Sequence, residues 1–275
     1  MNNVILLRHG EALHNVFPDA WKFGNEDILT LTEKGYVQAI NAAHHIVGKL
    51  KLERDDGLHI VSSDLMRARQ TTALVAHVLK DEHGIDCIER NDSEMRRSLR
   101  EFYAVFDGKR PDGFNFDEFL KDPFKVKFTE RNSIGPGHVK IRNPLDMMLD
   151  YQKLYEHVVE VSSHTPVLLV GHHFSLNIFR FLVHFNEVSD HGLMDTVAAA
   201  WIEAAEMKRR VQVTRGVESL QKLLTEVLTM PIDNASPMHA FSPDTRTPDD
   251  ELLTFKIKHW QKQLFAPQDD QLSVP

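Results

Sequence analysis

The chain has 275 residues, of which 42% are hydrophobic and 26% are charged, and this composition is typical of a folded protein with a substantial core. No stretch approaches the roughly 18 uninterrupted apolar residues of a membrane span, so we expect no contact with a membrane. The net charge of −8 argues against nucleic acid as a partner, because affinity for a phosphate backbone requires clustered positive charge.

The first part of the chain predicts a strand, a helix and a second strand. The apolar run Val4–Leu7 indicates a buried strand that ends at Arg8-His9-Gly10-Glu11. Apolar residues then recur at helical spacing over residues 31–50. The second strand, at residues 59–61, ends in Ser62-Ser63-Asp64, and Asp64 is the expected N-cap of the helix that follows.

The same alternation continues to about residue 182. A third strand is predicted at residues 85–88, a helix at about 145–162, and a fourth strand at 167–170 that ends in Gly171-His172-His173. Strands that alternate with helices imply βαβ units and a mostly parallel sheet. We therefore predict a single α/β domain over residues 1–275, in three layers with helices flanking the sheet.

Two stretches depart from this alternation. Residues 102–143 are rich in phenylalanine, lysine and arginine, and they indicate either a lid over the site or a long loop packed on the sheet edge. Residues 190–230 predict a helical insertion, whose apolar stripe could instead bind a second copy of the chain in a homo-oligomer. Residues 234–241 and 253–260 are interpreted as late strands, and residues 266–275 as a mobile tail.

Cysteine and histidine usage bears on the compartment and on metals. The single cysteine, Cys87, cannot form an internal disulfide and is interpreted as a packed hydrophobic residue. The N-terminus lacks the features of a signal peptide, so we expect a cytoplasmic location. Sixteen histidines are present, but neither His44-His45 nor His172-His173 has the His-x-x-x-His spacing of a helical zinc site. We therefore predict no metal and no cofactor.

Polar residues at the strand ends indicate a site for a phosphoryl group. Ligands of open parallel sheets bind beyond the carboxyl ends of the strands, where Arg8, His9 and His172 are expected to converge with Arg67 of the following helix. A guanidinium can hold two phosphate oxygens, and an imidazole can donate a proton or attack phosphorus. Gly10 would either allow close approach of the backbone to phosphate or serve only the turn.

These motifs resemble those of the histidine phosphatase superfamily, also called phosphoglycerate mutase-like. The resemblance covers residues 4 to about 182 and rests on four segments in order: Arg8–Glu11 with Asn15, Leu31–Gly35 with Gln38-Ala39, Ser63–Thr71, and Val170–His172. It implies that His9 becomes phosphorylated, that Arg8, Arg67 and His172 complete the phosphate site, and that Asn15 lies at the edge of that site.

Two further roles follow from the same resemblance. The family uses an acidic proton donor in a Leu-Arg-Glu segment, which makes Glu101 of Leu99-Arg100-Glu101 the candidate acid and Glu94 its competitor. His173 stands where the family commonly has glycine, and it is either an additional phosphate donor or a cap of the next helix.

The predicted function is hydrolysis of a phosphate monoester through a phosphohistidine intermediate, without a metal. One alternative is a mutase that returns the phosphoryl group to its substrate, although the long stretch between Asn15 and Leu31 favours hydrolysis. A second alternative is a non-catalytic scaffold that binds a phosphorylated ligand. The substrate is expected to be a phosphorylated small molecule or a phosphopeptide, and composition does not choose between them.

Overall fold

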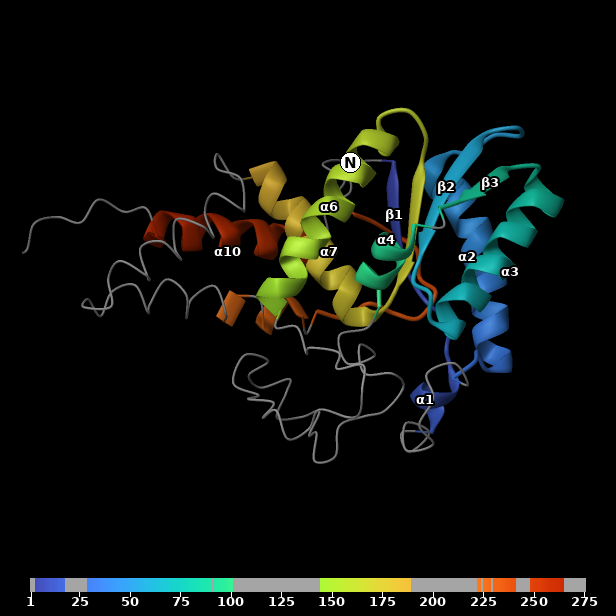
Figure 1. The fold of residues 1–275 in the computed structure, drawn as a ribbon, viewed down its shortest axis with the longest axis horizontal. Helices are drawn as coiled ribbons and strands as arrows, with labels where there is room; N and C mark the ends of the chain where they lie inside the picture. Colours follow the sequence, from blue (N-terminus) through green and yellow to red (C-terminus); the bar gives the residue numbers. More distant parts are fainter. Residues whose placement is uncertain are drawn as a thin grey trace, which may run out of the picture.

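The computed structural model describes residues 3–17, 29–90, 92–100, 144–188, 222–223, 225–228, 230–240 and 248–264. These residues form a central sheet with helices on both sides (Figure 1). The strands are β1 (Val4–Arg8), β2 (Gly57–Ser62), β3 (Asp86–Glu89), β4 (Val167–Gly171) and β5 (Met238–His239). The helices are α1 (Leu13–Val16), α2 (Glu33–Leu50), α3 (Met66–His83), α4 (Ser93–Ser98), α6 (Pro144–Ser162), α7 (His173–Val188) and α10 (Pro248–Leu264).

The sheet has the strand order β3-β2-β4-β1-β5 and is parallel except for β5, which runs antiparallel beside β1. The predicted α/β class with a mostly parallel sheet is thereby confirmed. The register pairs Arg8 with Gly171 and Ser62 with Val170, so β1, β2 and β4 end at the same edge of the sheet.

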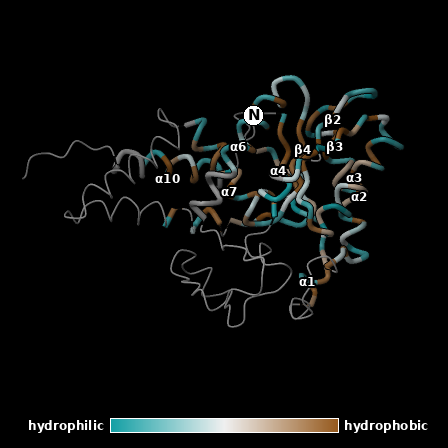
Figure 2. Tube along the Cα trace, in the orientation of Figure 1, coloured by the Kyte–Doolittle hydropathy of each residue, from teal (hydrophilic) through white to brown (hydrophobic). Residues whose placement is uncertain are grey.

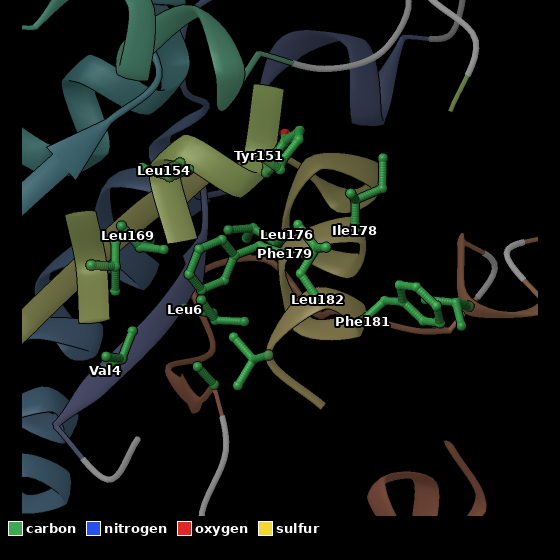
Figure 3. Close-up of a cluster of buried hydrophobic side chains, with 14 of the residues drawn as sticks. Val4, Leu6, Tyr151, Leu154, Leu169, Leu176, Ile178, Phe179, Phe181 and Leu182 are labelled. Atoms are coloured by element: carbon green, nitrogen blue, oxygen red, sulfur yellow. The ribbon is translucent and has the colours of Figure 1, made fainter. Parts of the chain in front are cut away.

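The central strands β1 and β4 are buried on both faces, which explains why each is a continuous apolar run in the sequence. Val4 and Leu6 pack with α6 and α7, as Figure 3 shows, whereas Ile5 and Leu7 pack against α2 and α3 on the opposite face. In Figure 2 the strands accordingly form a largely hydrophobic centre between the two helical layers. Helices on both faces give the predicted three layers.

Helix α2 begins directly against the loop that follows β1. The hydroxyl of Thr32 caps this helix by accepting a hydrogen bond from the backbone N–H of Gly35 at 3.1 Å. A Cβ atom on Gly35 would lie 2.0 Å from the carbonyl oxygen of Glu11, and one on Gly10 would lie 2.5 Å from the carbonyl oxygen of Gly35. Glycine is therefore required at both positions for the two backbones to touch.

The late strand predicted at residues 234–241 is confirmed only at residues 238–239, which form β5, and the strand predicted at residues 253–260 is wrong. This stretch lies inside α10, where Leu253 and Ile257 are buried four residues apart and the intervening Phe255 is 65% exposed. The alternation of apolar and polar residues suggested a strand. Pro248 at the first helical position, followed by acidic residues, was the overlooked sign of a helix N-terminus.

The prediction that Asp64 caps α3 is also wrong. Leu65 occupies the N-cap position and makes no side-chain capping bond. The carboxylate of Asp64 instead accepts two hydrogen bonds from the guanidinium of Arg100, at 2.6 and 2.7 Å. A bidentate pair with arginine outcompetes a single bond to a backbone N–H.

Most of the predicted insertions lie outside the described residues. This holds for residues 102–143 and 266–275, and for all of 190–230 except the short segments at 222–223, 225–228 and 230. Within those segments Leu223, Val227 and Leu228 are buried in the core formed with α7, so this part of the apolar stripe packs within its own chain. In the described ranges no helix is long and apolar enough to cross a membrane.

A buried ion pair joins α7 to α10. The guanidinium of Arg180, only 2% exposed, donates two hydrogen bonds to Oδ1 of Asp250, at 3.1 Å from Nε and 2.5 Å from Nη2. Nε2 of His184, also on α7, lies 3.1 Å from the same carboxylate oxygen. Asp250 therefore compensates a charge that α7 would otherwise bury alone.

We expect Asp250→Ala to lower the free energy of unfolding by about 3 kcal/mol or more, because it leaves the buried Arg180 charge without its carboxylate. Urea denaturation measures this loss, and hydrogen exchange should show α10 opening ahead of the sheet. Glu251→Ala changes an exposed acidic residue of the same helix turn and is the matched control. Equal stability of the two variants would contradict the structural role of this pair.

Candidate active site

The candidate site lies where β1, β2 and β4 end. Beyond these strands the backbone N–H of His9 donates to the carbonyl oxygen of Gly171 at 3.1 Å, and that of Ser63 donates to Val170 at 2.8 Å. These bonds extend the sheet by one residue and bring the side chains that follow it together. The ring centroids of His9 and His172 are 5.0 Å apart. The predicted convergence of strand ends is therefore present in the structure.

Two hydrogen bonds determine the tautomer of His9, whose side chain is 1% exposed. Nδ1 lies 2.7 Å from the carbonyl oxygen of Gly10, which can only accept, so Nδ1 carries the proton. Nε of Arg67 donates to Nε2 at 3.3 Å, so Nε2 carries the lone pair. The lone pair of this imidazole is thus on Nε2, which lies beside a guanidinium.

Arg67 has no exposed surface and is the second residue of α3. Thr71 connects this helix turn to the loop that follows β1. Its hydroxyl accepts a hydrogen bond from the backbone N–H of Gly10 at 3.1 Å and donates to the carbonyl oxygen of Arg67 at 2.8 Å. The His9 loop and the Arg67 helix are therefore held in register by one buried side chain.

His172 immediately precedes α7, at the end of β4. Its backbone N–H donates to Oγ of Ser175 at 2.9 Å, and its carbonyl oxygen accepts the first helical bond from Leu176. On its side chain, Nε2 lies 2.9 Å from Oγ of Ser63. The ring is thus held by Ser63, directly after β2, and the backbone of His172 is held by the first turn of α7.

A third imidazole, that of His14, lies in the same cluster and was not anticipated from the sequence. Its ring centroid is 5.6 Å from that of His9, and the residue is 9% exposed. The amide of Asn15 orients it, because Oδ1 of Asn15 accepts from the Ala12 N–H at 2.9 Å and leaves Nδ2 facing Nε2 of His14 at 3.2 Å. The role of Asn15 in substrate binding stays a prediction.

Arg8 and His173 both contact the segment that precedes β5. Nη1 of Arg8 donates to the carbonyl oxygen of Ile232 at 2.9 Å. Nε2 of His173 donates to the carbonyl oxygen of Leu228 at 3.0 Å, and this contact ties the first residue of α7 to residues 225–228. With that nitrogen occupied, a phosphate contact by His173 would have to come from its other ring nitrogen.

Burial and the neighbouring arginines keep the imidazoles of the site neutral. Burial, reinforced by Arg67, lowers the pKa of both His9 and His172 well below the usual value of about 6.5. The same causes lower the pKa of His14 to about 2. For His173, burial and then Arg8 lower the pKa to about 4. Neutral imidazoles are the form in which histidine can act as a nucleophile.

The two candidate acids, Glu101 and Glu94, belong to the segment around α4. Glu101 lies outside the described residues, and of Glu94 only its place in α4 is described. Arg100, which directly precedes Glu101, is joined to Asp64 by the bidentate pair described above. The start of the segment that carries Glu101 is therefore tied to the loop after β2. The assignment of Glu101 stays a prediction.

Cys87 is partly buried and packs against the core that contains α2 and α3, in agreement with its interpretation as a packed hydrophobic residue. Burial raises the pKa of the Cys87 thiol to about 11, so the thiol is protonated at neutral pH. Among the residues that the structure describes, no group of three or more histidine, cysteine or acidic side chains is arranged to hold a metal ion.

Comparison with protein families identifies the relationship. The family model of the histidine phosphatase superfamily (branch 1) matches residues 4–184, which is well over half of the chain. The chain belongs to the histidine phosphatase superfamily. In this family member, the matched range contains His9, Arg67, His14, Ser63 and His172.

Solved structures with similarity to this histidine phosphatase are distant. A mutant phosphoserine phosphatase from Entamoeba histolytica, in complex with phosphoserine, is 16% identical with a TM-score of 0.42, covering 85% of this chain and 87% of the other. Ecdysone phosphate phosphatase from Bombix mori, in complex with tungstate, is 14% identical with a TM-score of 0.43, covering 69% and 80%. Alpha-ribazole phosphatase from Shigella flexneri is 19% identical with a TM-score of 0.38, covering 65% and 79%. No curated protein matches the chain.

The neutral histidines of this family member make its stability depend on pH. Below about pH 6.5 the unfolded chain binds protons on His9, His14, His172 and His173 that the folded protein does not. The contribution of these histidines to the free energy of unfolding is therefore highest above pH 6.5. As the pH falls below this value, each imidazole lowers the free energy of unfolding by about 1.4 kcal/mol per pH unit. For His173 this loss ends near pH 4.

We therefore expect urea denaturation to show a steep fall in the free energy of unfolding between pH 6.5 and 4.5. His14→Gln should reduce the slope by about one proton, because it removes a histidine that is neutral only in the folded state. An unchanged slope in this variant would mean that the His14 imidazole is protonated in the folded protein.

Proposed function

We propose that the protein is a phosphatase that hydrolyses a phosphate monoester through a phosphohistidine on His9. The observation that carries this proposal is the tautomer of His9. Its proton is held on Nδ1 by the Gly10 carbonyl, and its lone pair lies on Nε2 beside the Arg67 guanidinium. A neutral imidazole with a fixed lone pair, next to a cation that can hold phosphate oxygens, is suited to attack on phosphorus.

In the first step Nε2 of His9 attacks the phosphorus atom, and the bond from phosphorus to the ester oxygen breaks. The electron pair of that bond leaves with the oxygen, which takes a proton from the carboxyl group of Glu101. Arg8, Arg67 and His172 would stabilise the charge on the three remaining phosphoryl oxygens. The products of this step are an alcohol and phosphohistidine.

In the second step water attacks the phosphohistidine, and the nitrogen–phosphorus bond breaks. The carboxylate of Glu101 accepts a proton from the water, which restores the acid for the next cycle. The electron pair returns to Nε2 of His9, and inorganic phosphate is released. Every proton transfer in this cycle uses side chains of this chain, so we propose a reaction that requires no metal or cofactor.

The proposed substrate is a phosphorylated small molecule or a phosphopeptide. Mutase action remains the alternative, since most of the stretch between Asn15 and Leu31, whose length favoured hydrolysis, lies outside the described residues, at 18–28. A scaffold that only binds phosphate is less favoured, because binding alone would not require an unprotonated nitrogen beside Arg67. Screening phosphorylated metabolites and phosphopeptides would identify the substrate class.

Brief reaction with an activated aryl phosphate should place an acid-labile phosphoryl group on His9, which mass spectrometry can locate. His9→Ala should lower kcat/KM by several orders of magnitude, because it removes the nucleophile. Activity should persist in the presence of a chelator. A label on a serine or on Cys87 would defeat the proposed mechanism.

The amount of inorganic phosphate separates hydrolysis from mutase action. For a hydrolase, phosphate released should equal substrate consumed throughout the reaction. Formation of a positional isomer with little free phosphate would replace our proposal with the mutase.

Glu101→Gln should slow reaction of alkyl phosphates by roughly 10²-fold or more, since a poor leaving group needs a proton as the ester bond breaks. Aryl phosphates with acidic leaving groups should react almost normally, because they leave without a proton. Measuring kcat/KM against leaving-group pKa tests this dependence. Glu94→Gln is the matched control, and the same dependence in that variant instead would identify Glu94 as the acid.

A further inference from the structure

Ser63 lies between β2 and α3 and has no exposed surface. Its hydroxyl makes two contacts among the described residues. The backbone N–H of Leu65 donates to Oγ at 3.4 Å, and Nε2 of His172 lies 2.9 Å from the same oxygen. The first contact is fixed in direction, because an N–H can only donate, whereas the second can run either way.

The proton of the Ser63 hydroxyl decides the direction of that second contact. In the part of the chain that the structure describes, Nε2 of His172 is the only acceptor in contact with Oγ. If Nε2 were protonated, Oγ would accept from both neighbours and its own proton would be buried without an acceptor, which is costly. If Ser63 donates to Nε2, the hydroxyl is satisfied both as donor and as acceptor, and of these two side chains only Nδ1 of His172 is left without a partner among the described residues.

The second arrangement places the imidazole proton of His172 on Nδ1. This nitrogen is buried and has no hydrogen-bond partner among the described residues. The ring itself is 5.0 Å from His9, centroid to centroid. An Nδ1–H group there can donate to a phosphoryl oxygen, whereas a bare Nδ1 would direct its lone pair at the anion.

We infer that Ser63 is a positioning residue that fixes the Nδ1–H tautomer of His172 and so presents a hydrogen-bond donor to the phosphoryl group. This inference rests on the proposed function for its phosphoryl ligand, but the tautomer exists without any ligand. His9 and His172 are then both protonated on Nδ1, but a different neighbour selects the tautomer of each ring. Gly10 leaves a lone pair on His9 for attack, and Ser63 leaves an N–H on His172 for binding.

The tautomer can be observed directly in the protein as it is. Proton–nitrogen correlation NMR of the chain labelled with ¹⁵N-histidine distinguishes a protonated from an unprotonated ring nitrogen, and His172→Asn identifies the His172 signals by their loss. We expect Nδ1 of His172 to be protonated and Nε2 to be unprotonated at pH 7. A proton on Nε2 of His172 in the unmodified protein would overturn the inference, whatever the catalytic activity.

Ser63→Ala should remove this preference and shift the proton of His172 toward Nε2. The variant should bind inorganic phosphate about tenfold more weakly, and its kcat/KM should fall by about 10-fold to 100-fold. The matched control is Ser62→Ala, because the neighbouring hydroxyl is also buried but donates to the Ser63 carbonyl oxygen and not to an imidazole. The control should keep the tautomer. An unshifted tautomer in Ser63→Ala would overturn the inference.

Replacing His172 tests which ring nitrogen the phosphoryl group meets. The amide nitrogen of asparagine can occupy the position of Nδ1, and that of glutamine can approach the position of Nε2. We expect His172→Asn to bind inorganic phosphate more tightly than His172→Gln, by about tenfold. The reverse order would show that Nε2 faces the phosphoryl group and would refute our inference. Phosphate binding in a protein without phosphatase activity would refute only the proposed function.

Discussion

The buried positive charge of Arg67 is the constraint on which the rest of the site depends. A guanidinium without exposed surface opposes any second cation nearby, so it lowers the pKa of His9, His14 and His172 beyond what burial alone does. The same charge favours an anion. His9, the proposed nucleophile, is therefore kept unprotonated by burial and by the same guanidinium that we propose to bind the phosphoryl oxygens.

Holding that charge beside His9 requires the loop after β1 and the first turns of α2 and α3 to fit closely. Thr71 joins Gly10 to the Arg67 turn, and the backbone of Gly10 touches that of Gly35. Two glutamines complete the fit. Oε1 of Gln38 accepts from the Glu11 N–H at 2.7 Å, and Oε1 of Gln70 accepts from the Leu31 N–H at 2.9 Å. These two glutamines therefore satisfy partly buried backbone N–H groups and join the loop after β1 to α2, and the segment before α2 to α3.

Sequence patterns predicted the parallel sheet and the strand ends that carry His9 and His172, because a strand buried on both faces has an unmistakable apolar run and its end is set by the first polar residues. Other features depend on distant partners. Residues 253–260 alternate like a strand, yet contact with α7 selects a helix. In the sequence Asp64 has the position of an N-cap residue, but in the fold its carboxylate accepts a hydrogen bond from Arg100. No motif in the sequence indicated that His14 belongs to the site, since a lone histidine near a turn is usually structural. Only the fold shows that its ring lies beside that of His9.

Arg67 and Arg180 are both deeply buried, but their surroundings differ. Arg180 has its anion inside the protein, in Asp250 on α10, and the pair joins two helices. Arg67 lies beside the imidazole of His9, whose pKa is lowered by burial and by the Arg67 charge. A bound phosphoryl group would oppose that charge, so the pKa values of His9, His14 and His172 should rise when substrate binds. The pH dependence of kcat, which reports on the complex, should therefore differ from that of kcat/KM, which reports on the free protein.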